Sequence, residues 1–364
     1  MAELTSPVEE VEDFWAWDEL ARRNNWTDGL PVAPPTEERV TEILDYLGRD
    51  PREVIGTIMP GGGIATVEQI VIQCVMAGCE PEHVPVVMAA VEAMLAPEFN
   101  LYGVQCTTNA AAPLTIVSGP AVERLGFNCK EGAFGGGSHA NAAVGRAVRL
   151  VLWNIGGGHP GQTDMSTLGQ PAKYLFCVAE NHEDSPWAPI HADHGLDPGQ
   201  SAVTVFACQS PDPLFVPGTA ERILNVIAAS LPTAGVNMFH AAGQFLLTIG
   251  VRPAQELARG GYDKEDVRQW IFKHARFNLG RLRKSGVLVE DEGHQYYWGH
   301  GEEDVPDLPS LPDDTMLPLV RTPSDIHLLV AGGATQWWLG FSAGWGNYGG
   351  RAVTKPILFP RDTP

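Results

Sequence analysis

The sequence predicts an α/β fold in which a mixed or parallel sheet is flanked by helices, with glycine-rich loops and a helical N-terminal segment. Apolar runs of strand length alternate with stretches of helical spacing along most of the chain, a pattern typical of such folds. Hydrophobic residues make up 44 % of the 364 residues and charged residues only 19 %, so the chain can build a large core. Glycine and proline together reach about 19 %, against a usual ~12 %, which predicts many tight turns.

The first half of the chain begins with helices. Apolar residues from Phe14 to Ala21 recur at helical spacing, and Thr36 is placed to cap a helix over 37–47. The elements expected next are a strand at 54–59 with a glycine exit loop at 60–63, helices at 66–77 and 81–95, strands at 102–106 and 114–117, and a helix at 142–155.

The second half repeats the alternation of strands and helices. The expected elements are strands at 174–179 and 203–207, a helix at 220–231, a strand at 245–251, a helix at 264–275, and strands at 326–330 and 351–354. An acidic, proline-containing surface excursion is expected at 291–314, and a glycine-rich loop with several tryptophans near 337–345.

Three portions describe this organisation. Residues 1–50 form the helical N-terminal segment, 51–210 an α/β core with the predicted site, and 211–364 a second α/β portion that includes the excursion and the Trp/Gly-rich tail. A weak boundary signal at 210–213 leaves open that the last two portions are one continuous domain.

Charge and cysteine content exclude several classes of function. The net charge is −20, so no basic face is available for nucleic acid. No apolar stretch reaches the ~18 residues of a membrane-spanning helix, and the acidic N-terminus is unlike a secretory signal, so we expect a cytoplasmic protein. The six cysteines contain no C-x-x-C pair and are expected to be reduced and mostly buried.

A glycine-rich loop before the helix at 142–155 is the first candidate for chemistry. Residues 135–141 combine glycines with Ser138, His139 and Asn141, which places free backbone N–H groups at a positive helix end. Arg146, further along, could bind a carboxylate. The alternative is a tight loop that packs close to backbone. Neither a Walker motif nor a dinucleotide fingerprint is present, so no nucleotide cofactor is expected.

Histidines and acids gather after the strand at 174–179, where open α/β sheets place ligands. Glu180 and His191 could act as proton carriers. His191, Asp193 and His194 could ligate a divalent metal, with Glu180 as general base. The alternative is a solvated acidic loop with incidental histidines.

Polar residues at 106–109 form a third candidate. Cys106 could act as a nucleophile if His139 or His159 approached it, while Thr107, Thr108 and Asn109 could hold a polar substrate or form an oxyanion site. A core cysteine followed by turn residues is the favoured alternative.

Several longer motifs resemble a known family. They are residues 25–36 (NWTDGLPVAPPT), 75–79 (VMAGC), 99–105 (FNLYGVQ), 145–150 (GRAVRL), and AEN at 179–181 with SPW at 185–187. Together they resemble a poorly characterised bacterial family with a TDGLPV-x-PPT signature, over about residues 25–355. Its members often occur with, or fused to, small thiol or selenol proteins that carry a U/C-G-S-C motif (the UGSC family). The resemblance implies thiol-assisted cleavage of a carbon–heteroatom bond. This chain has no C-G-S-C, so it would need the partner for that chemistry.

These observations lead to one main hypothesis and two alternatives. The chain is expected to be an enzyme, or the substrate-binding subunit of one, that acts on a small polar or anionic molecule by lyase or hydrolase chemistry. Asp28, Asn181 and Trp187 are further candidates for binding the substrate. The alternatives are a metal-dependent hydrolase and a non-catalytic assembly partner of a thiol-active protein. A homo-oligomer is expected from the acidity and the tryptophan-rich tail.

Overall fold

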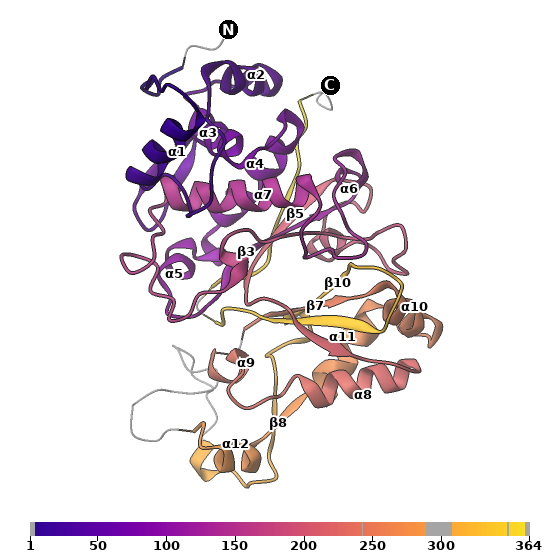
Figure 1. Ribbon diagram of the computed structural model, residues 1–364. Coiled ribbons are helices and arrows are strands. Elements are labelled where there is room, and N and C mark those ends of the chain that lie inside the picture. Colours follow the sequence, from indigo (N-terminus) through magenta and orange to yellow (C-terminus); the bar gives the residue numbers. More distant parts are fainter. Residues whose placement is uncertain (1–3, 242, 289–307, 348, 361–364) are drawn as a thin grey trace.

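The computed structural model describes residues 4–241, 243–288, 308–347 and 349–360 and confirms the α/β fold (Figure 1). Two four-stranded sheets are stacked in the middle of the molecule, with helices on the outside of each. Most of the predicted acidic excursion at 291–314 lies outside the described residues.

The first sheet belongs mainly to the N-terminal half. Its strand order is β12-β5-β3-β4, where β3 and β4 are parallel and the other pairs antiparallel. The strands are β3 (Ala112–Ser118), β4 (Cys177–Ala179), β5 (Ala202–Cys208) and β12 (Val353–Pro356). Because β12 comes from the C-terminal tail, the end of the predicted second portion returns to the first sheet.

The second sheet has the order β10-β7-β11-β6, with β7 and β10 parallel. Its strands are β6 (Asp212–Phe215), β7 (Phe245–Ile249), β10 (Ile326–Val330) and β11 (Trp338–Ala343). The helices α8 (Ala220–Ser230), α10 (Val251–Arg259) and α11 (Lys264–His274) share a hydrophobic core with its outer face.

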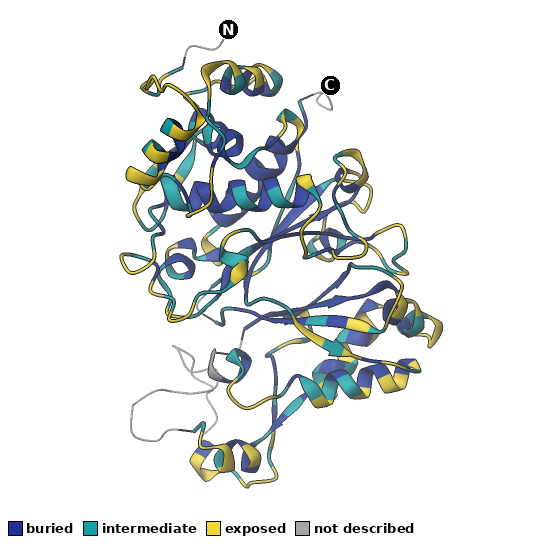
Figure 2. Cartoon of the chain, viewed as in Figure 1, coloured by how far each residue is buried: buried dark blue, intermediate teal, exposed yellow. Residues whose placement is uncertain are grey.

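The two sheets pack face to face, which gives four layers in the order helices, sheet, sheet, helices. Leu114 and Ile116 of β3 share a core with Leu246 of β7 and Leu329 of β10, between the sheets. Val117 points the other way, into the helical core of the first half. The central strands are therefore buried on both faces (Figure 2).

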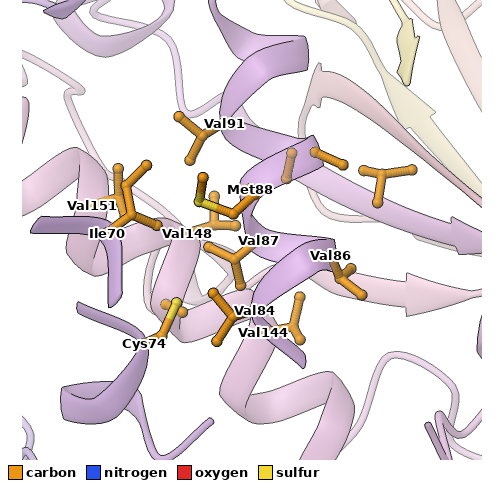
Figure 3. Close-up of a cluster of buried hydrophobic side chains, with 14 of the residues drawn as sticks. Ile70, Cys74, Val84, Val86, Val87, Met88, Val91, Val144, Val148 and Val151 are labelled. Carbon is orange, nitrogen blue, oxygen red and sulfur yellow. The ribbon is translucent and has the colours of Figure 1, made fainter. Parts of the chain in front are cut away.

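The helices of the first half build one apolar core. Figure 3 shows valines and Met88 of α4 (Val84–Met94) against Ile70 and Cys74 of α3 (Val67–Ala77) and Val144 and Val148 of α7 (His139–Leu150). The remaining elements are α1 (Phe14–Arg23), α2 (Glu37–Leu47), the hairpin β1 (Val54–Ile58) and β2 (Gly63–Thr66), α5 (Leu101–Cys106), α6 (Ala121–Arg124), α9 (Asn237–Ala241), β8 (Arg276–Asn278), α12 (Leu279–Ser285) and β9 (Met316–Pro318).

Some element predictions were wrong. Residues 102–106, predicted as a strand, lie in the helix α5, which Asn100 caps by accepting a hydrogen bond from the Gly103 N–H (3.2 Å). The glycine-rich tail at 337–345 contains the strand β11, and the predicted exit loop at 60–63 leads into the strand β2. Residue 251 begins the helix α10 rather than ending a strand.

In the described segments, no single helix has the length and apolar character needed to cross a membrane. Only the pair Pro81–Met94 and Pro97–Cys106, bent by 76°, reaches those limits together.

Candidate functional site

A pocket of about 520 Å³ opens beside the C-terminal end of α7. Its wall includes Arg149, Trp153, Asp164, Lys173 and Tyr174. These residues come from the end of α7, the turn that follows it and the loop at 160–174. The pocket thus combines aromatic surface with a small group of charged side chains, which is the usual composition of a small-molecule site.

Arg149 is a buried cation with little bonding of its own. It sits among apolar residues of α7, and its side chain is only 9 % exposed. Within the described residues it donates one hydrogen bond, from Nη2 to the Gly158 carbonyl (3.1 Å), and its ion pair with Asp164 is long (3.9 Å). Burial lowers its pKa, against the nearby acids. Because a guanidinium has five N–H donors, most of them remain for a ligand or solvent.

Asp164 and Lys173 form a close ion pair in the same wall. The Lys173 ammonium lies 2.8 and 2.7 Å from the two carboxylate oxygens of Asp164, whose side chain is buried. Burial lowers the pKa of Lys173, whereas the hydrogen bond to Asp164 raises it. Together with Arg149 and Asp28, they give the pocket lining two cations and two acids. The charges of the lining therefore balance, in a chain of net charge −20.

The backbone around the pocket has an uncommon shape. After α7 the chain continues as one π-helical turn, Val151–Ile155, which contributes Trp153 to the wall. Such turns are rare and frequently occur at functional sites. The hairpin β1–β2 packs against this turn so closely that a Cβ on Gly63 would lie 2.1 Å from the Ile155 carbonyl oxygen. Only glycine fits at this contact.

The TDGLPV segment forms the next part of the wall, and Arg146 holds it in place. Arg146 donates to both carboxylate oxygens of Asp28 (3.1 and 2.8 Å) and to the carbonyls of Leu30 and Pro31. The Trp153 indole N–H donates to the Asn25 carbonyl (2.8 Å). Asp28 lines the pocket, while Arg146 is occupied in positioning the turn instead of waiting for a substrate carboxylate.

Residues 106–109 lie close to this pocket, but their polar groups mainly form hydrogen bonds with other segments of the chain. The Thr107 hydroxyl accepts from the Trp345 indole (2.9 Å), and the Asn109 amide donates to Asn237 (3.0 Å). The Thr108 carbonyl accepts from the Thr167 N–H, which anchors the pocket loop (3.0 Å).

Cys106 does not have the surroundings of a nucleophile. Burial and the charge of Asp164 both raise the pKa of its thiol. Neither predicted histidine partner is directed at it: His139 bonds the Gly78 carbonyl (2.8 Å), and His159 packs on the Trp153 ring at a centroid distance of 4.8 Å.

The polar side chains of the glycine-rich loop before α7 form hydrogen bonds with each other and with the nearby backbone. Ser138 is the N-cap, and its hydroxyl donates to Asn141 Oδ1 (2.7 Å). The Asn141 amide in turn donates to the Asn128 carbonyl (3.0 Å). These contacts fix the start of α7, at the opposite end of that helix from Arg149.

Glu180 is enclosed without any exposed surface. Both of its carboxylate oxygens accept from the Ile190 N–H, at 3.1 and 2.9 Å. Burial raises its pKa to about 7, although the charge of Lys264 opposes the rise. Nearby, Asn181 bonds Asp184 and the Trp187 indole donates to the Tyr262 carbonyl, so these two residues stabilise the turn that follows β4.

The predicted metal ligands each have other partners. His191 Nδ1 bonds the Ser118 hydroxyl (2.7 Å) and its Nε2 the Asp197 carbonyl (3.1 Å). Asp193 pairs with Lys264 and Arg268 at 3.0 and 2.5 Å, and His194 stacks on His327. In the part of the chain that the structure describes, no group of three or more His, Cys, Asp or Glu residues is arranged to hold a metal.

The three predicted loops do not meet at one point. Residues 106–109 precede β3, whereas Glu180 follows β4, which runs parallel to β3 with Ala179 opposite Val117. The span from Ala112 to Val117 alone is roughly 17 Å at ~3.3 Å per residue. Only the loops before α7 and after β4 approach each other, through the ion pair of Lys130 with Glu183 (3.0 Å).

Sequence reasoning missed Arg149, Trp153, Asp164 and Lys173. One signal was available for Arg149, because it is a lone cation within an otherwise apolar helical stretch, 147–152. Asp164 and Lys173 gave no such signal, since they lie nine positions apart along the chain and their side chains meet only in the folded protein.

Comparison of the chain with protein-family models and with curated proteins found no match. The geometry of the pocket therefore carries the functional inference.

Proposed function

We propose that this chain is an enzyme, or the substrate-binding subunit of one, which takes a small organic anion into the pocket beside the end of α7. The observation that carries this proposal is Arg149, a buried guanidinium that lines the pocket with most of its donors unused. A planar, permanently charged fork of this kind suits a carboxylate or a similar anion. Trp153 would pack against the organic part of the ligand.

Lys173 is the group that we propose to move a proton. Burial lowers its pKa below the ordinary value of a lysine, which eases release of its proton, and Asp164 holds its ammonium in place. A proton carrier next to an anion anchor suits lyase or hydrolase cleavage of a carbon–heteroatom bond. The hydrolase that would use His191, Asp193 and His194 as metal ligands is not carried forward, because these side chains are engaged elsewhere.

A second candidate function is the docking of a partner protein at the mouth of the pocket. Three large side chains of the pocket loop are well exposed: Met165 (51 %), Leu168 (94 %) and Tyr174 (50 %). A partner that supplies a thiol, as the family resemblance implies, would cover them. This candidate is tested separately from anion binding by the variant Leu168→Ser. If a partner docks here, it should copurify with the wild-type chain and be lost from the variant.

The main test uses a panel of small carboxylates, sulfonates and phosphates, with titration calorimetry for binding and proton NMR for cleavage. Arg149→Gln should weaken binding of the best anion roughly 10- to 100-fold, as expected for loss of a charged hydrogen bond. Arg259→Gln is the matched control, because Arg259 is 66 % exposed and far along the chain, and it should change nothing. Lys173→Met should abolish cleavage while binding persists.

Either of two results would remove the proposal. One is wild-type affinity in a folded Arg149→Gln protein, and the other is a panel in which no anion binds. Undiminished cleavage by Lys173→Met would remove only the proton-transfer role.

A further inference from the structure

Two cysteines meet at the C-terminal end of α3, away from the pocket. The helix ends in a left-handed glycine, Gly78 (φ +86°). The Cys79 N–H donates to the Cys74 carbonyl and the Gly78 N–H to the Val75 carbonyl, both at 2.9 Å. This pair of bonds defines a Schellman motif, in which the side chains of the positions held here by Cys74 and Cys79 contact each other.

The backbone already brings the two residues within reach of a disulfide. Through the Cys79–Cys74 hydrogen bond, the two Cα atoms cannot be more than about 7 Å apart, and disulfides usually join Cα atoms 4.4–6.8 Å apart. Both thiols are almost fully buried in the same hydrophobic core, and each influences the pKa of the other. Figure 3 places the Cys74 sulfur in the apolar core between α3, α4 and α7.

The two thiols differ in reactivity. Contact with Cys74, aided by the His83 imidazole and opposed by burial, lowers the pKa of Cys79, whereas burial raises that of Cys74. His83 Nδ1 accepts from the Glu80 N–H (3.1 Å), so the imidazole proton lies on Nε2. Burial raises the pKa of each of the other four cysteines. Cys79 is thus the thiol that is most readily ionised.

A surface pocket lies next to the chain segment that follows Cys79. It has a volume of about 430 Å³ and is lined by Tyr46, Glu80, Glu82 and His83, among others. His83 lines this pocket and also influences the Cys79 thiol, so it joins the two. Because the thiol is buried, only an oxidant as small as hydrogen peroxide suits it.

We propose that Cys74 and Cys79 form a reversible disulfide, with Cys79 as the thiol that a peroxide oxidises and Cys74 as the thiol that resolves it. The Cys79 thiolate attacks one peroxide oxygen, the O–O bond breaks, and hydroxide leaves. The Cys74 sulfur then attacks the Cys79 sulfenic acid, the S–O bond breaks, and water leaves. Two thiols are oxidised and one peroxide is reduced to two waters.

The test treats the full chain with a small excess of hydrogen peroxide, followed by alkylation after unfolding, intact mass and non-reducing peptide mapping. The wild-type protein should lose two hydrogens, give a linked Cys74–Cys79 peptide, and recover both thiols with dithiothreitol. Cys74→Ser should stop at a dimedone-reactive sulfenic acid on Cys79, and Cys129→Ser, the matched control, should behave as wild type. His83→Gln should slow the reaction.

The proposal fails if peroxide-treated wild-type protein still alkylates at both Cys74 and Cys79. It also fails if Cys79 in Cys74→Ser oxidises no faster than Cys129. The wild-type mapping decides the matter by itself if a serine variant does not fold.

Discussion

Arg149 and Glu180 are both buried and ionisable, and their hydrogen bonds decide which of them marks a site. The Glu180 carboxylate is enclosed and accepts from the Ile190 backbone with both oxygens. Arg149 instead lines a pocket and, within the described residues, has one hydrogen bond for its five N–H groups. Glu180 is enclosed in the interior and out of a ligand's reach, whereas Arg149 has spare donors at a cavity and is available to a ligand.

Glu180 should make the folded protein less stable as pH rises. Burial raises its pKa to about 7 in the folded state, whereas an unfolded chain ionises it near ~4.3. The folded state therefore keeps a proton that the unfolded state releases. The stabilising contribution is complete below pH ~4.3 and is lost as pH rises through about 7, which lowers the free energy of unfolding by up to about 3 kcal/mol.

Urea unfolding between about pH 5 and pH 8 measures this effect. Glu180→Gln should flatten the pH dependence and be the more stable protein at pH 8, because glutamine cannot ionise. Glu183→Gln, at a 72 % exposed side chain, is the control and should keep the wild-type slope. Parallel curves for wild type and Glu180→Gln would contradict the assignment.

Residue types and spacing located candidate side chains but could not show which partners they already had. His191 bonds Ser118, which is 73 residues earlier, and Asn109 bonds Asn237, which is 128 residues later. Both contacts depend on how strands and loops come together. Asp28 was a substrate-binding candidate because its turn motif is local, although the site itself was predicted elsewhere, whereas the Asp164–Lys173 pair required the fold.

At the scale of elements, the sequence located most helices and strands from their periodicity. The element predictions failed where a glycine allows two segments of the chain to pack closely together. Glycines such as Gly340 led to the prediction of a loop at 337–345, yet Gly340 lies in the strand β11. Glycine is needed there because a Cβ would lie 2.7 Å from the Cβ of Pro211 in the neighbouring chain segment. Gly103 similarly allows α5 to contact Trp345, and the short apolar run at 102–106 fits a helix or a strand equally well.

The contact between the TDGLPV turn and α7 gives the prediction at this scale. Arg146→Met should lower the free energy of unfolding by about 3 kcal/mol, because it leaves the Asp28 carboxylate, only 3 % exposed, without its cation. Urea unfolding measures the loss. The double variant Asp28→Asn with Arg146→Met should lose less, since no buried charge remains. A loss below ~1 kcal/mol for Arg146→Met would show that the pair does not hold the turn.

The whole molecule joins two sheets face to face, and its charge is distributed unevenly. The chain carries 24 Lys and Arg against 44 Asp and Glu, yet the pocket lining holds two cations, Arg149 and Lys173, against two acids, Asp28 and Asp164. A pocket whose cations offset its acids repels anions less than the rest of an acidic surface does. Composition gave the overall charge but not this local balance, which arises only when the end of α7, the 25–31 turn and the 160–174 loop come together.

The most direct test of the central claim is a crystal structure of the protein with the tightest-binding anion of the panel. We expect the anionic group within hydrogen-bonding distance of the Arg149 guanidinium, with the organic part against Trp153 and the ammonium of Lys173 nearby. An anion bound instead in the open pocket lined by Tyr262, Trp270 and Lys273, with the space beside Arg149 filled by water alone, would contradict the claim.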